Sequence, residues 1–376
     1  MKKFTVSLIL SLFCVFSSIS AFSWSGIVDN NSKLSANDDF SAISLAQSNG
    51  VYLSAKSKLN EAGNLRFSAE GLYKYSLDCA FKEKQASFKN IADVDLLKVT
   101  GEWNIQKGVL TVNAGRFQYS DFSGVVFSQA SDGVYAAYDA LKFKASVYAG
   151  YTGFLNRLNV SMVENEVTGN EQFYALCPRY IPVMADFAYK ALLETNTIGL
   201  QLAAYLPASS DYAFKLYGTL IGNGYIKTLG SYDVKLTVGT EKFDGLMLDA
   251  KVDTNFYINS NIVATAGAEY VSGGKAGFNP FVTLSSRSFG SAPVTDSVIV
   301  PKLAVMYVKD KLYGSVTERI IISMEDEVKL HGFDTAINVI YNLFSDLQLG
   351  GDVGVYISKE KELSNYFATI KASLAF

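Results

Sequence analysis

The chain has 376 residues, of which 49% are hydrophobic, 18% are charged and 13% are aromatic, and its formal net charge is −3. This composition excludes a disordered chain, and the lack of basic clusters argues against nucleic-acid binding. Three cysteines are too few for a disulfide scaffold, and a single histidine disfavours His-based zinc sites and most catalytic triads. We therefore expect no cofactor and no metal. The length fits either a soluble two-domain protein or one large barrel, and the pattern of apolar and polar residues must distinguish the two.

Residues 1–20 have the pattern of a secretory signal peptide. Lys2 and Lys3 form a positive start, an apolar run extends from Phe4 to Ile19, and small residues follow. We considered a membrane-anchor helix and a lipoprotein signal ending at Cys14. The apolar run is shorter than a membrane-spanning helix needs, and apolar residues continue beyond Cys14. The sequence thus predicts an exported chain whose mature part is 21–376.

The mature chain alternates between apolar and polar residues almost throughout. In 142–151, for example, Phe143 and Val147 fall on one face, whereas Lys142 and Lys144 fall on the other. Short clusters of turn-forming residues separate the alternating runs. In chain order the pattern predicts eighteen strands: 22–35, 42–59, 64–76, 92–103, 109–119, 131–139, 142–151, 196–206, 211–222, 230–241, 245–257, 261–271, 277–286, 299–309, 312–323, 334–343, 346–358 and 364–376.

The length of these strands favours an all-β antiparallel transmembrane barrel. Strands of soluble β-sandwiches and propellers average only about five or six residues. A tilted strand that crosses a membrane needs about ten, with its apolar face toward lipid and its polar face toward the lumen.

The last strand carries a second indication. It runs from Tyr366 to Phe376 with no tail, and Ile370, Leu374 and Phe376 share its apolar face. This resembles the closing strand of bacterial outer-membrane β-barrels, and the whole mature chain looks like the porins, which have 16 or 18 strands. The resemblance implies biogenesis through periplasmic chaperones and the barrel-assembly machinery, which reads the C-terminal signal. It also implies contact with outer-membrane lipid, a multi-pass location in the bacterial outer membrane and passive diffusion of small polar solutes. A homo-oligomer is compatible with it.

Residues 152–195 are the weak point of this topology, because a structureless stretch of that length is uncommon. One reading places it in the lumen as a constriction that carries Arg157 and Arg179. In the other reading, residues from Val183 to Ala191 form an additional strand, and the total becomes sixteen or twenty. With both termini in the periplasm, 152–195 and 287–298 lie outside, and 272–276 lie in a periplasmic turn.

Charged residues on the predicted inner face are the candidate pore-lining groups, because lumen charges set the field of a channel. They are Arg66, Glu70, Lys98, Glu102, Arg116, Lys142, Lys144, Lys235, Asp249, Lys251, Asp253, Glu269 and Asp352. The two signs are mixed, so we expect mild selectivity. The alternation slips at Gly115-Arg116, either as a β-bulge that re-aims Arg116 or as a plain register break.

The remaining reactive residues give weaker indications. Cys79 and Cys177 fall in predicted outside loops, and in an oxidising compartment they form a candidate disulfide. No Ser or Asp constellation can be placed beside His331, so an enzyme is disfavoured. The function that we expect is therefore an outer-membrane porin. The alternatives are a closed barrel that binds ligands at the cell surface and a substrate-specific transporter.

Overall fold

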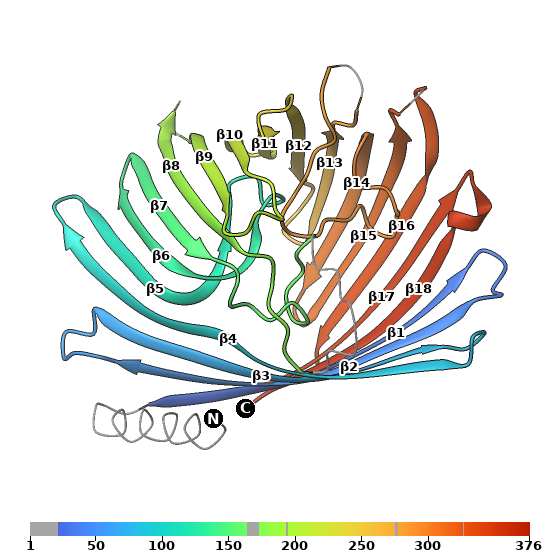
Figure 1. The fold of residues 1–376 in the computed structure, drawn as a ribbon, viewed down its shortest axis with the longest axis horizontal. Helices are drawn as coiled ribbons and strands as arrows, with labels where there is room; N and C mark the ends of the chain where they lie inside the picture. Colours follow the sequence, from blue (N-terminus) through green and yellow to red (C-terminus); the bar gives the residue numbers. More distant parts are fainter. Residues whose placement is uncertain (1–21, 164–172, 193–194, 275–276, 326) are drawn as a thin grey trace.

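The computed structural model describes residues 22–163, 173–192, 195–274, 277–325 and 327–376. The predicted signal peptide lies outside these residues. Within them, eighteen antiparallel strands follow one another around a single sheet, and β1 pairs with both β2 and β18. The sheet is therefore a closed barrel, and its interior holds several long loops (Figure 1). No helix among the described residues is long and apolar enough to cross a membrane.

The strands and one short 3-10 helix have the following bounds: β1 Ser23–Asn37, β2 Ile43–Lys58, β3 Leu65–Ala80, β4 Gln85–Ile105, β5 Gly108–Ser120, β6 Ser128–Ala140, β7 Phe143–Tyr151, β8 Tyr180–Leu192, β9 Asn196–Pro207, β10 Lys215–Ile226, β11 Gly230–Glu241, β12 Met247–Tyr257, β13 Ile262–Val271, β14 Val298–Lys309, β15 Leu312–Ser323, β16 Lys329–Asn342, β17 Leu347–Ser358, η1 Lys361–Leu363 and β18 Asn365–Ala375.

The alternation read from the sequence becomes the two faces of the barrel wall. In β9, Leu200 and Leu202 point outward and Leu202 is 58% exposed, whereas Gln201 between them points inward and is 1% exposed. Successive residues of a strand point to opposite faces of the sheet. The outer wall is consequently apolar, and the polar and charged side chains gather inside.

The barrel is closed at its last residue. The backbone of Phe376 exchanges two hydrogen bonds with Gly26, at 2.8 and 2.9 Å. A Cβ at position 26 would lie 2.3 Å from the Phe376 ring, so any larger residue there would displace the ring. The C-terminal residue is thus part of the seam between β1 and β18.

Two predictions of strands were wrong, and their errors cancel in the total. Residues 180–192 form β8, which was the alternative for part of 152–195, and the remainder, 152–179, is a loop. Residues 277–286 are not a strand but belong to the loop between β13 and β14. Phe281 and Leu284 of this segment pack into a hydrophobic cluster inside the barrel. The count therefore stays at eighteen rather than becoming sixteen or twenty.

The missed strand β8 also reverses the predicted direction of the strands between 196 and 271. β7 and β13 run in the same direction, so the β13–β14 loop leaves the barrel at the same end as the loop 152–179. We call this the loop end and the opposite one the turn end. Residues 272–274 thus begin a loop at the loop end and are not part of a periplasmic turn.

Candidate functional site

Three loops from the loop end fold into the barrel and bind one another. They are 121–127, the described parts of 152–179 and the described parts of 272–297, and we call them together the constriction body. The backbone N–H groups of Leu284 and Ser285 donate to the carbonyl oxygen of Val126, at 2.9 and 3.0 Å. Val163 donates to Leu284 at 2.9 Å. Segments far apart in the sequence are thereby joined into one unit (Figure 1).

A hydrophobic cluster fixes the constriction body to one side of the wall. Phe127, Leu155 and Leu284 of the loops pack in this cluster with inward-facing tyrosines of the strands, among them Tyr148 and Tyr205. Burial of this apolar surface stabilises the folded loops at roughly 25 cal/mol per Å². A barrel of this strand number encloses a channel when its interior is empty. The loops therefore narrow that channel from one side.

Arg116 ties the loop 152–163 to the wall. Its Nε and Nη2 atoms donate to the two carboxylate oxygens of Asp132 at 2.8 and 2.9 Å, and Nη2 also donates to the carbonyl oxygen of Phe154 at 2.8 Å. Asp93 faces the same guanidinium at 3.3 Å. The planar fork of arginine suits such bidentate binding. Arg116 thus holds a loop and does not project freely into the pore.

The geometry at Gly115 explains the slipped alternation. Gly115 has a φ of +120°, and a Cβ there would lie 2.1 Å from the carbonyl oxygen of Leu97. The pairing of β4 with β5 is nevertheless continuous through Arg116, and the register shift lies between β3 and β4, at Glu70/Gly71. The slip at Gly115-Arg116 is therefore not a bulge in the β4–β5 ladder but coincides with a glycine at positive φ.

Arg287 ties the β13–β14 loop to the wall in the same way. Its Nη1 atom is 2.8 Å from Asp249 Oδ2, and Nη2 makes an ion pair with Glu269. The ring of Phe289 lies 5.0 Å from the guanidinium carbon, which adds a cation–π contact. Sequence analysis missed Arg287, because the run that precedes it was read as a strand.

Asp334 holds the same loop further along. Its Oδ1 atom accepts the backbone N–H of Ser291 at 2.7 Å, and its Oδ2 atom is 2.7 Å from Arg319 Nη1. Sequence analysis did not identify Asp334 as a residue that holds a loop. The His331 ring instead contacts the Tyr356 hydroxyl.

Asp121 organises the shortest loop of the constriction body. Its Oδ1 atom accepts the backbone N–H groups of Gly124 and Phe127, and its Oδ2 atom accepts the Ser123 hydroxyl. Burial raises the pKa of Asp121 to about 6, and these hydrogen bonds oppose the rise. The site thus contains a carboxyl group that changes charge in mildly acidic solution.

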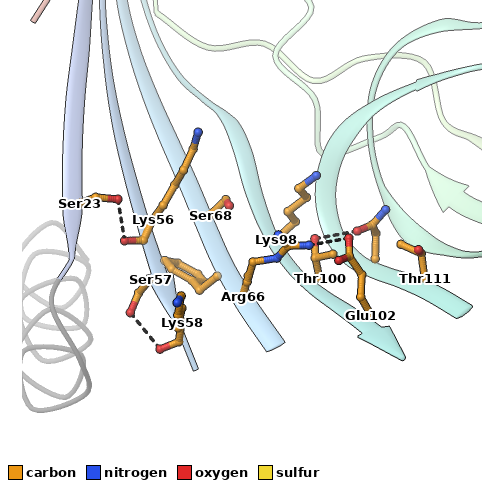
Figure 2. A pocket seen from close by; sticks show the side chains of 12 residues that line it. Ser23, Lys56, Ser57, Lys58, Arg66, Ser68, Lys98, Thr100, Glu102 and Thr111 are labelled. Atoms are coloured by element: carbon orange, nitrogen blue, oxygen red, sulfur yellow. Dashed lines mark hydrogen bonds and ion pairs between the residues drawn. The ribbon is translucent and has the colours of Figure 1, made fainter. Parts of the chain in front are cut away.

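The open part of the lumen lies along β1–β5. A cavity of about 740 Å³ at the turn end is lined by Lys56, Lys58, Arg66 and Lys98, against one carboxylate, Glu102. Figure 2 shows Lys56 and Lys98 extending in the same direction, with Arg66 directed at Glu102. The Arg66–Glu102 distance is 2.5 Å, and both side chains remain nearly half exposed. This mouth of the barrel is basic.

Two smaller cavities border the constriction body. One of about 330 Å³ lies between β1–β4 and the loop 152–163, and its charged lining is Lys33, Lys74, Asp78, Lys89 and Arg157. The other, of about 180 Å³, is bounded by the Arg287 loop and by charged residues of both signs, Lys251, Asp253, Glu269, Lys302 and Arg319. Basic side chains therefore outnumber acidic ones in both cavities, by four to two beside the β13–β14 loop and by four to one beside β1–β4.

The residues predicted to line the pore are distributed over these regions. Arg66, Lys98 and Glu102 border the cavity of about 740 Å³, and Lys251, Asp253 and Glu269 border the cavity of about 180 Å³. Five of the others make polar contacts on the inner face of the barrel: Glu70 with Ser54, Arg116 with Asp132, Lys235 with the Ser123 carbonyl oxygen, Asp249 with Arg287, and Asp352 with Lys371. The remaining two, Lys142 and Lys144, lie at the β6–β7 turn on the rim of the barrel. Of the two loop arginines, Arg157 borders a cavity, and Arg179 is exposed next to β8.

The predicted disulfide is not formed. Cys79 and Cys177 are free thiols. Cys79 lies in β3, where Lys74 and Ser76 line the lumen, so the odd-numbered Cys79 points to the outer face. Cys177 is buried inside the constriction body, and burial raises its pKa to about 12. The prediction failed because it placed Cys79 in a loop. Among the described residues, no group of three or more His, Cys, Asp or Glu side chains could hold a metal ion.

Comparison with known proteins finds similarity at the level of the fold. No protein-family model matches the chain, and no curated protein matches it. A BenF-like porin from Pseudomonas fluorescens Pf-5 is similar with a TM-score of 0.65 at 10% identity, covering 95% of this chain and 99% of that one. OccK7 (OpdD) of Pseudomonas aeruginosa gives 0.64 at 12% identity, with 95% and 99% covered. OccAB4 of Acinetobacter baumannii gives 0.60 at 12% identity, with 95% and 98% covered. The closed eighteen-stranded barrel of this chain is thus a porin-like fold.

Proposed function

We propose that the protein is an outer-membrane porin, through which small hydrophilic solutes diffuse passively along the β1–β5 side of the lumen. The observation that carries the proposal is the division of the interior. Folded loops occupy one side, whereas charged cavities of about 740 and 330 Å³ line the other. The apolar outer wall suits lipid, and closure leaves no unpaired sheet edge in the membrane. The similar fold of a BenF-like porin supports the same conclusion.

The remaining expectations from the sequence belong to this proposal. Biogenesis would use periplasmic chaperones and the barrel-assembly machinery, and the seam position of Phe376 gives its ring a structural role as well. No step of the proposed function requires a cofactor or a catalytic residue. The turn end would face the periplasm, so a basic mouth would form the periplasmic exit.

Liposome swelling tests the proposal. Proteoliposomes that contain the folded protein should swell in small sugars and amino acids, at rates that fall as the solute grows. Protein denatured before reconstitution is the control for leak. A folded barrel that permits no swelling would instead favour a closed barrel that binds ligands at the surface. Swelling with one solute class only would favour a substrate-specific transporter.

A further inference from the structure

Three carboxylates on the open side of the lumen lack a basic partner. They are Asp29 of β1, Glu70 of β3 and Asp95 of β4, and we call them the carboxylate belt. Asp29 lies on the same inner face of β1 as Lys33. The Tyr52 phenol of β2 interacts electrostatically with all three carboxylates, so they are grouped around one side chain. Among the described residues, none of the three takes part in an ion pair.

The carboxylate belt is held by neutral groups alone. Glu70 accepts the Ser54 hydroxyl, and Asp95 Oδ1 accepts the side-chain amide of Asn159 in the constriction body at 2.5 Å. The Oδ1 atom of Asp29 is buried and has no hydrogen-bond partner among the described residues. Inward carboxylates on other strands each pair with a lysine or arginine, for example Asp249, Asp253 and Asp352. The belt therefore presents negative charge that the wall does not neutralise.

The carboxylate belt lies between the two basic cavities of the open side. On β3 the inward charges from the loop end to the turn end are Lys74, Glu70 and Arg66, four residues apart. Lys74 lines the cavity of about 330 Å³, and Arg66 lines that of about 740 Å³. Four residues of a strand span about 13 Å. The neighbouring strands repeat the order, as Lys89, Asp95 and Lys98 on β4, and as Lys33, Asp29 and Lys56 on β1 and β2.

This order of charges favours a solute that carries both signs. A small anion is attracted by the basic cavities and repelled at the carboxylate belt, and a small cation meets the reverse. A linear solute with one ammonium and one carboxylate group can place the ammonium at the belt and the carboxylate in a neighbouring basic cavity. Both ends then lie beside the opposite charge, and the solute meets no region that repels it as a whole.

We propose that the carboxylate belt and the two basic cavities form a track for linear zwitterions, and that short peptides are the class that fits its spacing. An extended peptide gains about 3.3–3.6 Å per residue, so three or four residues reach from one charged region to the next. The charges of the track are wet, so each contact is weak and the solute can leave again. The proposal rests on the porin function proposed above and narrows its substrate class.

Interruption of the ion current by glycine peptides tests the proposal in planar bilayers that contain the full chain. Glycine, diglycine and triglycine differ in the separation of their two charges. N-acetyltriglycine and triglycinamide are close to triglycine in length but carry one charge each. Triglycine should halve the current at a concentration about threefold lower than any of the others except diglycine, which should be intermediate.

Variants of the carboxylate belt locate the effect. Asp29→Asn with Glu70→Gln removes two charges of the belt and keeps its shape, so triglycine should lose its advantage over N-acetyltriglycine. Asp29→Asn alone leaves the contact of Glu70 with Ser54 intact and should lose part of the advantage, which keeps the test available where the double variant does not fold. Asp233→Asn is the matched control, an inward carboxylate on β11 at the opposite side of the barrel, and it should retain the full advantage.

Two results would overturn the proposal: a current that triglycine interrupts no better than glycine does, or the same loss of preference in Asp233→Asn as in the belt variants. Either channel would still conduct, so the porin function would stand. Folded protein that carries no current and permits no swelling in small sugars would overturn the function, and the track with it.

Discussion

At the scale of single residues, burial separates two kinds of charge pair in the lumen. The Arg116 side chain is 12% exposed and is shared among two carboxylates and a loop carbonyl. The Arg66 side chain is 46% exposed and pairs with Glu102 alone. Removal of one partner from a buried pair leaves the other charge unpaired, whereas an exposed pair contributes little. The contacts of Arg116 therefore stabilise the folded structure, whereas the Arg66–Glu102 pair contributes mainly to the electrostatic field at the mouth of the barrel.

The two arginines give a matched pair of variants. Arg116→Gln should lower the free energy of unfolding by about 3 kcal/mol and free the 152–163 loop, whereas Arg66→Gln should cost less than about 1 kcal/mol. Urea unfolding in detergent, followed by heat-modifiable gel mobility, measures both. Equal losses for the two variants would contradict the role assigned to Arg116.

The pH dependence of the loop 121–127 follows from Asp121. Its pKa in the folded protein, about 6, lies above the ordinary value of 3.8. A raised pKa means that the folded state favours the protonated form, so this contribution to stability is complete below pH 3.8 and is lost as the pH rises through 6. The loss amounts to roughly 3 kcal/mol. Unfolding measured from pH 4 to 7.5 should show this slope in the native protein and lack it in Asp121→Asn, and an equal slope in both would disprove the assignment.

At the scale of the elements, the alternation of apolar and polar residues predicts strands well. It cannot show whether the apolar side of a segment faces lipid or packs on other residues inside the barrel. The runs 142–151 and 246–257 alternate because one face meets lipid and the other meets the lumen. The run 277–286 is instead a loop, whose Phe281 and Leu284 pack in the same cluster as Phe127 inside the barrel. β8 was recognised as an alternative from its own alternation. Sequence alone could not show that Arg287 and Asp334 hold a loop, because their partners are distant in the chain.

The β13–β14 loop should control the width of the pore. Arg287→Gln removes both ion pairs to the wall, so the loop should leave its position and the single-channel conductance should rise and become noisier. Lys302→Gln is the control, since Lys302 pairs with Asp253 within the wall and holds no loop. Conductance that is unchanged in Arg287→Gln, or raised equally in both variants, would show that the loop does not limit the current.

At the scale of the whole molecule, the uneven lining predicts a weak preference for anions. Four basic side chains and one acidic side chain line the cavity at the turn end, and four basic and two acidic side chains line the cavity beside the β13–β14 loop. Fixed charge in a narrow, wet lumen concentrates counter-ions. Lys56→Glu with Lys98→Glu should therefore move the reversal potential in a salt gradient toward that of a cation-preferring pore, by a few-fold in the permeability ratio. Lys359→Glu, outside the barrel wall, should leave the reversal potential unchanged.

The central claim is that an open path runs past β1–β5, and thiol modification of a conducting channel tests it most directly. Lys98→Cys in a Cys79→Ser background is reconstituted in a planar bilayer, and a charged, membrane-impermeant thiol reagent is added during recording. If the path is open, the conductance should be stable and should fall in steps on modification, and it should not change when Leu202→Cys on the outer wall is treated in the same way. Folded protein that carries no current, or a current that modification at position 98 leaves unaltered, would contradict it.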